Sequence, residues 1–119
     1  MPYTLVDKII KAQRAENEKT RKQVLAAVTE ILSAITLKYG FSEAYIFGST
    51  VKKGKFHSES DVDIAIFNLS NQHFFSLMAE MSRRLERNVD LYQIEKMDEG
   101  LRRKVEEQGL LWKKQDLIF

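Results

Sequence analysis

The chain has 119 residues, of which 30% are charged, and its 19 basic and 17 acidic side chains leave a net charge of only +2. This length suits one domain with a sizeable core. The balanced charge gives no general argument for binding nucleic acid or a membrane. The sequence has no cysteine, no apolar run long enough to cross a membrane and no signal-peptide pattern. We expect a single domain over residues 1–119 in a cytoplasmic protein that binds neither membranes nor, directly, nucleic acid.

The N-terminal region, residues 1–39, is predicted to be helical. From residue 3 onward it contains neither glycine nor proline, and Thr4 followed by Asp7 resembles a capping box. Gly40 supplies a C-terminal stop. Two apolar stripes at helical spacing flank a polar stretch, so the pattern indicates two helices or one long helix with a solvated middle. The first stripe is Leu5, Val6, Ile9 and Ile10; the second is Val24, Leu25, Val28, Ile31, Leu32 and Ile35.

The first of these stripes has two interpretations. We expect an amphipathic helix here to fold back onto the body of the domain, where its apolar face would be buried. The alternative is that the stripe forms an interface with a partner protein.

Residues 45–67 are predicted to form a strand, a loop and a second strand. Successive side chains of a strand point to opposite faces, so Asp61 and Asp63 share one face while Val62 and Ile64 share the other. Two carboxylates at this spacing can hold one hard cation, and oxygen ligands suit Mg²⁺ or Mn²⁺ better than zinc. The alternative is that Asp61 caps the strand edge and Asp63 is a solvated side chain.

The first strand of this unit ends at a candidate phosphate-binding turn. Gly48 allows unusual backbone dihedrals and close approach of a ligand, and Ser49 offers a backbone N–H and a hydroxyl. The loop that follows contains Lys52 and Lys53. His57 lies in the same loop, where we expect an exposed side chain rather than a nucleotide contact.

The order Gly-Ser, eleven intervening residues and Asp-x-Asp resembles the signature of the nucleotidyltransferase superfamily that includes DNA polymerase beta. The short chain resembles its minimal nucleotidyltransferase branch. The resemblance implies a small α/β (α+β) fold, with a mixed sheet of three to four strands, helices packed on it and an N-terminal helical extension. It implies a catalytic core over residues 42–94.

A second helix and a third strand follow. Phe74, Leu77, Met78, Met81 and Leu85 recur at helical spacing, which predicts a helix through to Arg87. We expect Asn88 to end it in the left-handed conformation and residues 89–94 to form a strand. Arg83, Arg84 and Arg87 sit where cations favour a helix C-terminus; a nucleic-acid patch is the less favoured interpretation.

The resemblance implies that Asp90, on the third strand, completes a catalytic set with Asp61 and Asp63. The alternative for Asp90 is a cap on the helix-to-strand turn. In the family's chemistry two Mg²⁺ ions, with Mn²⁺ as the alternative, lie about 4 Å apart. Asp61 and Asp63 would bridge both ions, and Asp90 would bind the ion beside the acceptor and take its proton. Gly48 and Ser49 would hold the outgoing pyrophosphate, and Lys52 or Lys53 would take the place of the arginine that binds phosphate in the family's loop.

The C-terminal region, residues 95–119, is predicted to contain a helix over 98–107 with Leu101 and Val105 facing inward. A short strand or hook follows over residues 109–112, in which we expect Trp112 to pack in the core or at its edge. The apolar residues 117–119 are expected to dock on this chain or on another.

The resemblance also implies a nucleotide and a partner. Minimal nucleotidyltransferases commonly pair with a HEPN-domain protein as toxin and antitoxin, and neutralise it by transferring AMP from ATP to a tyrosine or by binding it. The leading hypothesis is therefore a Mg²⁺-dependent nucleotidyltransferase, using ATP or another nucleoside triphosphate, that modifies a HEPN partner. A non-catalytic antitoxin is the second hypothesis, and an enzyme acting on a small molecule or an RNA 3′ end is the third. A homo-oligomer is left open.

Overall fold

The computed structural model describes residues 4–115, which form one four-stranded sheet and three α-helices. The strand order is β3-β2-β1-β4; β2 and β3 are parallel, and the other two neighbouring pairs are antiparallel. The expected mixed sheet is thus confirmed, with four strands. The elements are α1 (Leu5–Tyr39), β1 (Glu43–Phe47), the 3₁₀ helix η1 (Gly48–Val51), β2 (Val62–Ile66), α2 (Asn71–Leu85), β3 (Val89–Gln93), the 3₁₀ helix η2 (Ile94–Lys96), α3 (Glu99–Gln108) and β4 (Leu110–Lys113).

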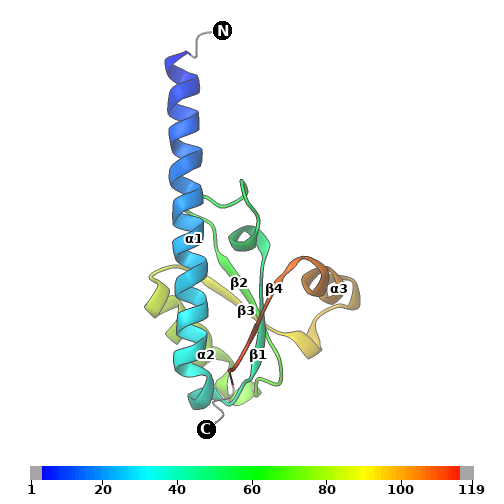
Figure 1. Cartoon of the computed structure of the whole chain (residues 1–119). Helices are drawn as coiled ribbons and strands as arrows, with labels where there is room; N and C mark the ends of the chain where they lie inside the picture. The colour runs from blue at the N-terminus through cyan, green and yellow to red at the C-terminus, as the bar shows by residue number, and fades with distance from the viewer. Residues whose placement is uncertain (1–3, 116–119) are drawn as a thin grey trace.

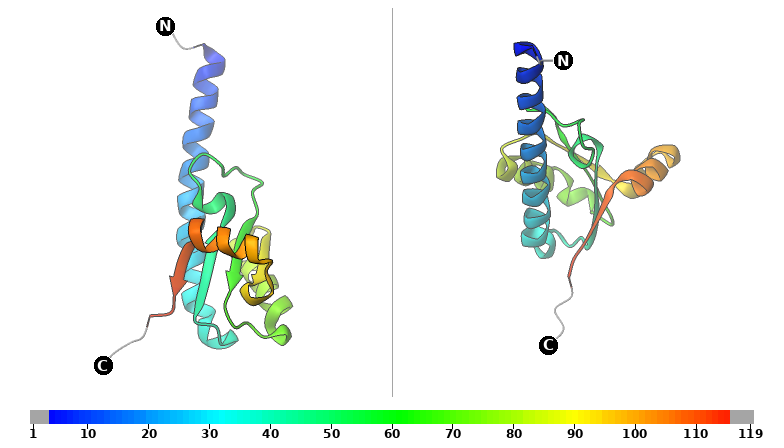
Figure 2. Two further views of the ribbon diagram at one scale, coloured as in Figure 1. Left: turned by 90° about the vertical axis from the view of Figure 1, so that its right-hand side faces the viewer. Right: turned by 45° about the horizontal axis from the view of Figure 1, so that its top comes forward.

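The sheet is covered on both faces (Figures 1 and 2). Helices α1 and α2 pack on one face, where Leu32 and Leu77 join a core that includes Ile64 of β2. Helix α3 covers part of the other face, where Val105 packs with Ala65, the next residue of β2. Because strand side chains alternate, neighbouring residues of β2 serve the two cores.

Helix α1 is continuous over 35 residues. Thr4 and Asp7 form the capping box expected at its start, and Gly40 ends it with φ +75° while donating to the Thr36 carbonyl. Of the two arrangements predicted for this region, the single long helix is confirmed. Residues 5–39 contain no glycine or proline at which the helix could break.

The prediction that the first apolar stripe folds back is wrong. Leu5, Val6, Ile9 and Ile10 are 44% to 74% exposed, and the N-terminal half of α1 projects beyond the sheet (Figure 1). The second stripe is buried against the sheet and fixes the direction of the helix. An unbroken helix of this length spans about 50 Å, so its first turns lie beyond the body of the protein.

Helix α2 ends two residues before the expected position. Leu85 is its last residue, and Glu86, not Asn88, adopts the left-handed conformation with φ +52°. The carbonyl of Asn88 accepts a hydrogen bond from the Val62 N–H at 3.0 Å. Asn88 already belongs to the β2–β3 pairing, so the helix has to end earlier. The strand predicted over residues 89–94 is β3. It is one residue shorter than expected because Ile94 begins η2.

A buried carboxylate joins α1 to α2. The Glu80 side chain is only 5% exposed and accepts hydrogen bonds from Lys38 Nζ at 2.8 Å, Tyr39 Oη at 2.6 Å and Arg84 Nε at 2.9 Å. These hydrogen bonds, led by that of Lys38, lower the pKa of Glu80 to about 2. Arg84, one of the three arginines near the end of α2, therefore already has Glu80 as its ion-pair partner.

The C-terminal elements follow the prediction with one exception. Asp98 caps α3 by accepting from the Leu101 N–H, and Trp112 of β4 is 8% exposed and packs against Phe41. Val105 is buried as expected, but Leu101 is 39% exposed, so its predicted inward position is wrong. The predicted docking of residues 117–119 lies outside the described residues.

Candidate functional site

Two carboxylates face each other across the parallel strands β2 and β3. Asp63 is the register partner of Asp90, so both side chains project from the same face of the sheet. The two neighbouring strands that carry them lie about 4.8 Å apart. This is the face that α3 partly covers, because Ala65, two residues after Asp63, packs against Val105 of α3. Asp61 is exposed and comes directly before β2, not within it as predicted.

The three carboxylates interact electrostatically. Burial raises the pKa of Asp63 to about 6, helped by the charges of Asp90 and Asp61 and by a hydrogen bond with Asp90. Burial and the same three charges also raise the pKa of the nearby Tyr92. A bound cation would offset the negative charge that Asp90 and Asp61 place beside Asp63.

The donor set fits a hard divalent ion. Carboxylate oxygens alone suit Mg²⁺ or Mn²⁺, and Asp63 interacts electrostatically with both Asp61 and Asp90. Among residues 4–115, no group of three acidic, histidine or cysteine side chains lies close enough together to hold a metal ion as the side chains stand. The residues therefore fit the ion chemically, and their side chains would have to converge when it binds.

Gly48 lies directly against Asp63. Its φ is +75°, which favours glycine, and a Cβ built on it would overlap Asp63 Oδ2. The register of β1 and β2 explains this contact, because Phe47 is the partner of Asp63 and the chain turns into η1 immediately afterwards. The sheet thus brings the Gly-Ser turn beside the carboxylates. Ser49, half-buried in η1, is the next residue of the chain.

Helix α1 anchors η1 through an arginine. Arg21 Nη1 donates to the Thr50 carbonyl at 3.1 Å, and the guanidinium also holds Glu18 through two hydrogen bonds. The Thr50 side chain is fully buried, and its hydroxyl has no hydrogen-bond partner among the described residues. Sequence reasoning missed Arg21: its spacing from Glu18 predicts an intrahelical pair, but nothing local indicates a contact 29 residues away.

A second arginine anchors the loop that leads to Asp61. Arg87 Nη1 donates to the carbonyls of Ser58 at 3.0 Å and Ser60 at 2.8 Å, and its guanidinium lies 4.8 Å from the centre of the Phe56 ring. Arg87 therefore lies beyond α2 and holds the loop, instead of stabilising the helix C-terminus as predicted. With Arg84 also paired, the three arginines do not form a free basic patch.

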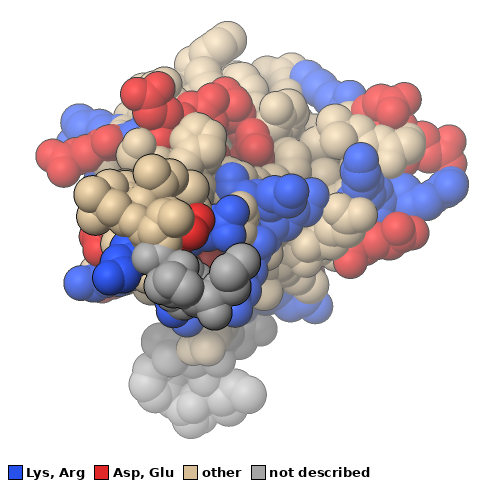
Figure 3. Space-filling model, turned by 90° about the horizontal axis from the view of Figure 1, so that it is seen from above, with Lys and Arg blue, Asp and Glu red and all other residues tan. Residues whose placement is uncertain are grey.

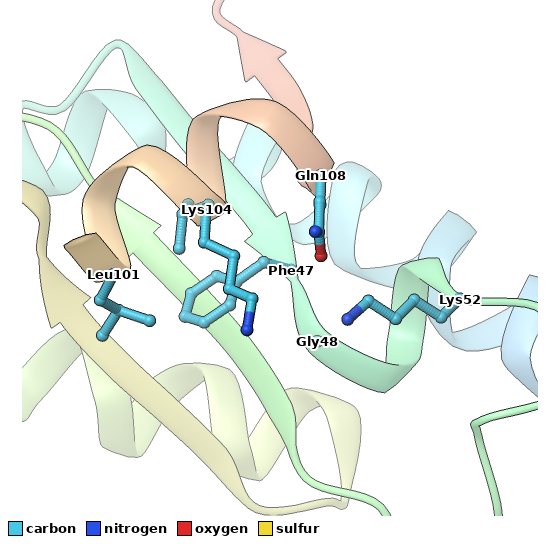
Figure 4. Close-up of a pocket in the computed structure, with 7 residues that line it drawn as sticks. Phe47, Gly48, Lys52, Leu101, Lys104 and Gln108 are labelled. Carbon is cyan, nitrogen blue, oxygen red and sulfur yellow. The ribbon is translucent and has the colours of Figure 1, made fainter.

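The two lysines predicted as candidates for binding phosphate, Lys52 and Lys53, differ in their position relative to Gly48. Lys52 borders a cleft that also includes Gly48 (Figure 4). Lys53 is exposed, does not line that cleft and helps to lower the pKa of Glu18 on α1. His57 is exposed, and its Nδ1 accepts from the Glu59 N–H at 3.2 Å, so its ring shapes the loop.

Charge is unevenly distributed over the end of the molecule from which α1 projects. Lys and Arg side chains gather beside the protruding helix, and acidic side chains form separate groups (Figure 3). No helix in residues 4–115 combines the length and the apolar character that crossing a membrane requires.

The mixed sheet, its helices on both faces and the Gly-Ser turn beside β2 define the small α+β fold of nucleotidyltransferases. The model of the family "Polymerase beta, Nucleotidyltransferase" matches residues 30–117. The chain therefore belongs to the polymerase beta nucleotidyltransferase family.

Solved structures support the fold. One chain of a toxin–antitoxin complex crystallised with AMP-PNP is 26% identical, with a TM-score of 0.62 over 73% of this chain and 74% of that one. A protein provisionally described as a minimal nucleotidyltransferase is 20% identical, with a TM-score of 0.63 over 74% and 92% of the two chains. A chain of the MntA–HepT toxin–antitoxin complex is 21% identical, with a TM-score of 0.56 over 73% and 70%. No curated protein matches the chain significantly.

Proposed function

We propose that this chain is a Mg²⁺-dependent nucleotidyltransferase that transfers AMP from ATP to a protein hydroxyl. One observation carries the proposal: Asp63 is in register with Asp90 and in contact with the Gly48 turn. The carboxylates and the Gly-Ser turn, which we propose binds phosphate, are thereby adjacent. Family membership and the likeness to a chain of a complex containing AMP-PNP support this reading of the site.

The roles follow from the chemistry of the residues. Asp61 and Asp63, with Asp90, would hold the divalent metal, which would supply charge neutralisation and a more acidic acceptor hydroxyl. Ser49, through its N–H and hydroxyl, would hold the phosphates beyond the one transferred. The acceptor oxygen attacks the α-phosphorus, the bond to pyrophosphate breaks, and Asp90 takes the acceptor's proton. Most of the work is positioning and charge neutralisation, which a small protein can provide.

We further propose a HEPN-domain protein as the partner and a tyrosine on it as the acceptor, with the pair acting as toxin and antitoxin. The similar chains from toxin–antitoxin complexes support this choice. The exposed stripe on α1 offers a surface for a partner, because large apolar side chains at helical spacing are the usual means by which a helix docks on another protein.

The test is incubation of the purified protein with each of the four nucleoside triphosphates and Mg²⁺, with and without the protein encoded beside it, followed by intact mass of both chains. A gain of one or more AMP units on the neighbour, abolished by Asp63→Ala, supports the proposal. Retained transfer in both Asp61→Ala and Asp63→Ala would contradict it. Circular dichroism of each variant checks that it is folded.

A second function is a non-catalytic antitoxin that acts by complex formation. The projecting stripe on α1 favours it, since binding through that surface needs no carboxylate. The double variant Asp61→Asn, Asp63→Asn separates the two. Full neutralisation of the toxin by this variant supports binding alone, and lost protection supports catalysis.

A further inference from the structure

A second cleft, the α2–β3 cleft, lies beside the edge strand of the sheet, between α2 and β3. Its volume is about 480 Å³, which is within the range of pockets that bind small molecules. The residues that line it come from α2, from β3 and from the loops before β2 and β3: Phe75, Met78, Ala79, Ser82, Asp61, Asn88, Val89 and Asp90. Two carboxylates of the candidate site, Asp61 and Asp90, therefore also border this cleft.

The α2–β3 cleft and the Gly-Ser turn lie on opposite sides of Asp63. The strand order is β3-β2-β1-β4, so Asp63 on β2 has β3 on one side and β1, which leads into Gly48, on the other. A nucleotide held at Gly48 leaves the Asp90 side free for a second reactant. The cleft is on that free side, so a group bound in it can reach the carboxylates.

Helix α2 gives the cleft an apolar wall. Phe75 is 72% exposed, and its ring contacts the ring of Phe74 edge-on, with 5.2 Å between the ring centres. Met78, one helical turn further on, is half-buried and packs against the core. Ser82, another turn on, accepts a hydrogen bond from the Val89 N–H at 3.2 Å and so ties α2 to β3. An exposed aromatic ring on a wall fixed in this way favours an apolar or aromatic occupant.

The charge of the lining disfavours a nucleic acid as the occupant. Among the eight described residues that border the cleft, two are carboxylates and none is a cation. Of the arginines near the end of α2, Arg84 pairs with Glu80, and Arg87 binds loop carbonyls. A nucleic-acid strand would bring its phosphates against the two carboxylates without a cation to offset them. A neutral hydroxyl group on a protein meets no such repulsion.

We propose that the α2–β3 cleft receives the acceptor side chain of a protein partner, and that this side chain is a tyrosine. Its ring lies against Phe75 and Met78, and its phenol oxygen reaches Asp90. Tyrosine suits this place because it combines an apolar ring with a polar tip, whereas serine and threonine have no ring to pack against Phe75. The inference rests on the proposed function: the phenol oxygen bonds to the α-phosphorus of ATP, the bond to pyrophosphate breaks, and the phenol proton passes to Asp90.

Filling the cleft tests this assignment. Ala79→Trp places a large ring in the cleft, and Ser76→Trp, at an exposed position of α2 that does not line the cleft, is the matched control. We expect Ala79→Trp to lower AMP transfer to the protein encoded beside this chain by at least about tenfold, through KM, as the loss of a well-packed contact does. Phe75→Ala should act in the same direction. Affinity for an ATP analogue should be unchanged in all three variants, and thermal unfolding establishes that each is folded.

A second readout requires no reaction. N-acetyl-tyrosinamide, a neutral tyrosine derivative, is titrated against the full chain in the presence of Mg²⁺ and the ATP analogue, and its binding is followed by NMR. We expect it to bind the wild-type protein and Ser76→Trp, and to bind Ala79→Trp at least about tenfold more weakly.

The possible results distinguish this inference from the proposed function. If the wild-type protein transfers AMP to its neighbour and Ala79→Trp does so equally well, the cleft is not the acceptor site and the proposed function stands. If no transfer occurs but N-acetyl-tyrosinamide binds and Ala79→Trp prevents it, the cleft is an aromatic site and the proposed function fails. If AMP goes to the 3′ end of an oligoribonucleotide instead of to the neighbour, or if the folded wild-type protein neither transfers AMP nor binds the derivative, the tyrosine assignment is overturned.

Discussion

Gly48 and Asp63 are packed so closely that a methyl group on Gly48 would overlap the Oδ2 atom of Asp63. The contact arises because β1 ends opposite Asp63 and the chain then turns through a left-handed glycine. The turn that would hold phosphate and the carboxylate that would hold metal therefore share one boundary. A substitution of either residue should therefore alter the position of the other.

Gly48→Ala should abolish metal and nucleotide binding, because its methyl group would displace the Asp63 carboxylate. Gly54→Ala is the matched control: its φ is +82°, similar to the +75° of Gly48, but a Cβ at this position would meet no atom within 4 Å. Both variants should lose about 1 kcal/mol of stability through left-handed backbone strain, measured by urea unfolding. Only Gly48→Ala should lose Mn²⁺ binding, and equal binding by the two variants would contradict the contact.

The raised pKa of Asp63 makes stability depend on pH in a definite direction. Its pKa is 3.8 as an ordinary Asp and about 6 in the folded protein, so between these values the folded state holds a proton that the unfolded state has lost. Without metal, the stability of the wild-type protein should fall, relative to Asp63→Asn, as pH rises from about 4 to about 6, and the difference should then level off. Thermal unfolding in EDTA at successive pH values measures this; a difference that grows in the opposite sense would refute the assignment.

Mn²⁺ binding should show the complementary pH dependence. The ion binds the ionised carboxylates, so its affinity should rise as pH increases through about 6, where Asp63 loses its proton. A titration of Mn²⁺ affinity between about pH 5 and pH 8 checks this. Affinity that is independent of pH over that range would count against Asp63 as a ligand.

Arg21→Ala should weaken nucleotide binding without removing metal binding. Arg21 donates to the Thr50 carbonyl and so positions η1, but it is on α1 and contacts no carboxylate of the site. The exposed Lys19, on the same helix, is the control, and Lys19→Ala should have no effect. Affinities for an ATP analogue and for Mn²⁺, measured separately, test the distinction; an unchanged nucleotide affinity in Arg21→Ala would mean that η1 needs no such anchor.

The exposed stripe on α1 should matter for partner binding alone. The double variant Leu5→Ser, Ile9→Ser changes side chains that are 74% and 59% exposed, so stability should change by no more than about 0.5 kcal/mol. Complex formation with the neighbouring protein should be lost. Leu37→Ser, which alters another exposed leucine at the opposite end of α1, is the control. Size-exclusion chromatography of the mixed proteins reports the result, and an intact complex with the double variant would exclude this surface.

The sequence predicts the fold well because its signals are local. The alternation around Asp63, the helical spacing in α2 and the turn at Gly48 each depend on neighbouring residues. The mixed sheet follows from the order of these elements together with the family resemblance. The assignment of Asp61, Asp63 and Asp90 to catalysis stays a prediction, although the structure brings Asp63 and Asp90 into register.

What the sequence does not predict depends on contacts between distant segments. Arg21 reaches Thr50, and Lys104 comes to the same cleft as Lys52, only because of how α1 and α3 lie on the sheet. The expected fold-back of the first stripe of α1 is wrong because helix continuity outweighs the burial of that stripe. Without a glycine or proline in the helix, its first turns cannot bend back to Leu32 and its neighbours.

The most direct test of the central claim is the number of Mn²⁺ ions that bind per chain, measured by electron paramagnetic resonance with and without a non-hydrolysable ATP analogue. If Asp61, Asp63 and Asp90 form a metal-nucleotide site beside Gly48, two ions should bind in the presence of the analogue, and Asp63→Asn should abolish this binding while remaining folded. Absence of Mn²⁺ binding by the wild-type protein, or the same binding by Asp63→Asn, would contradict the account.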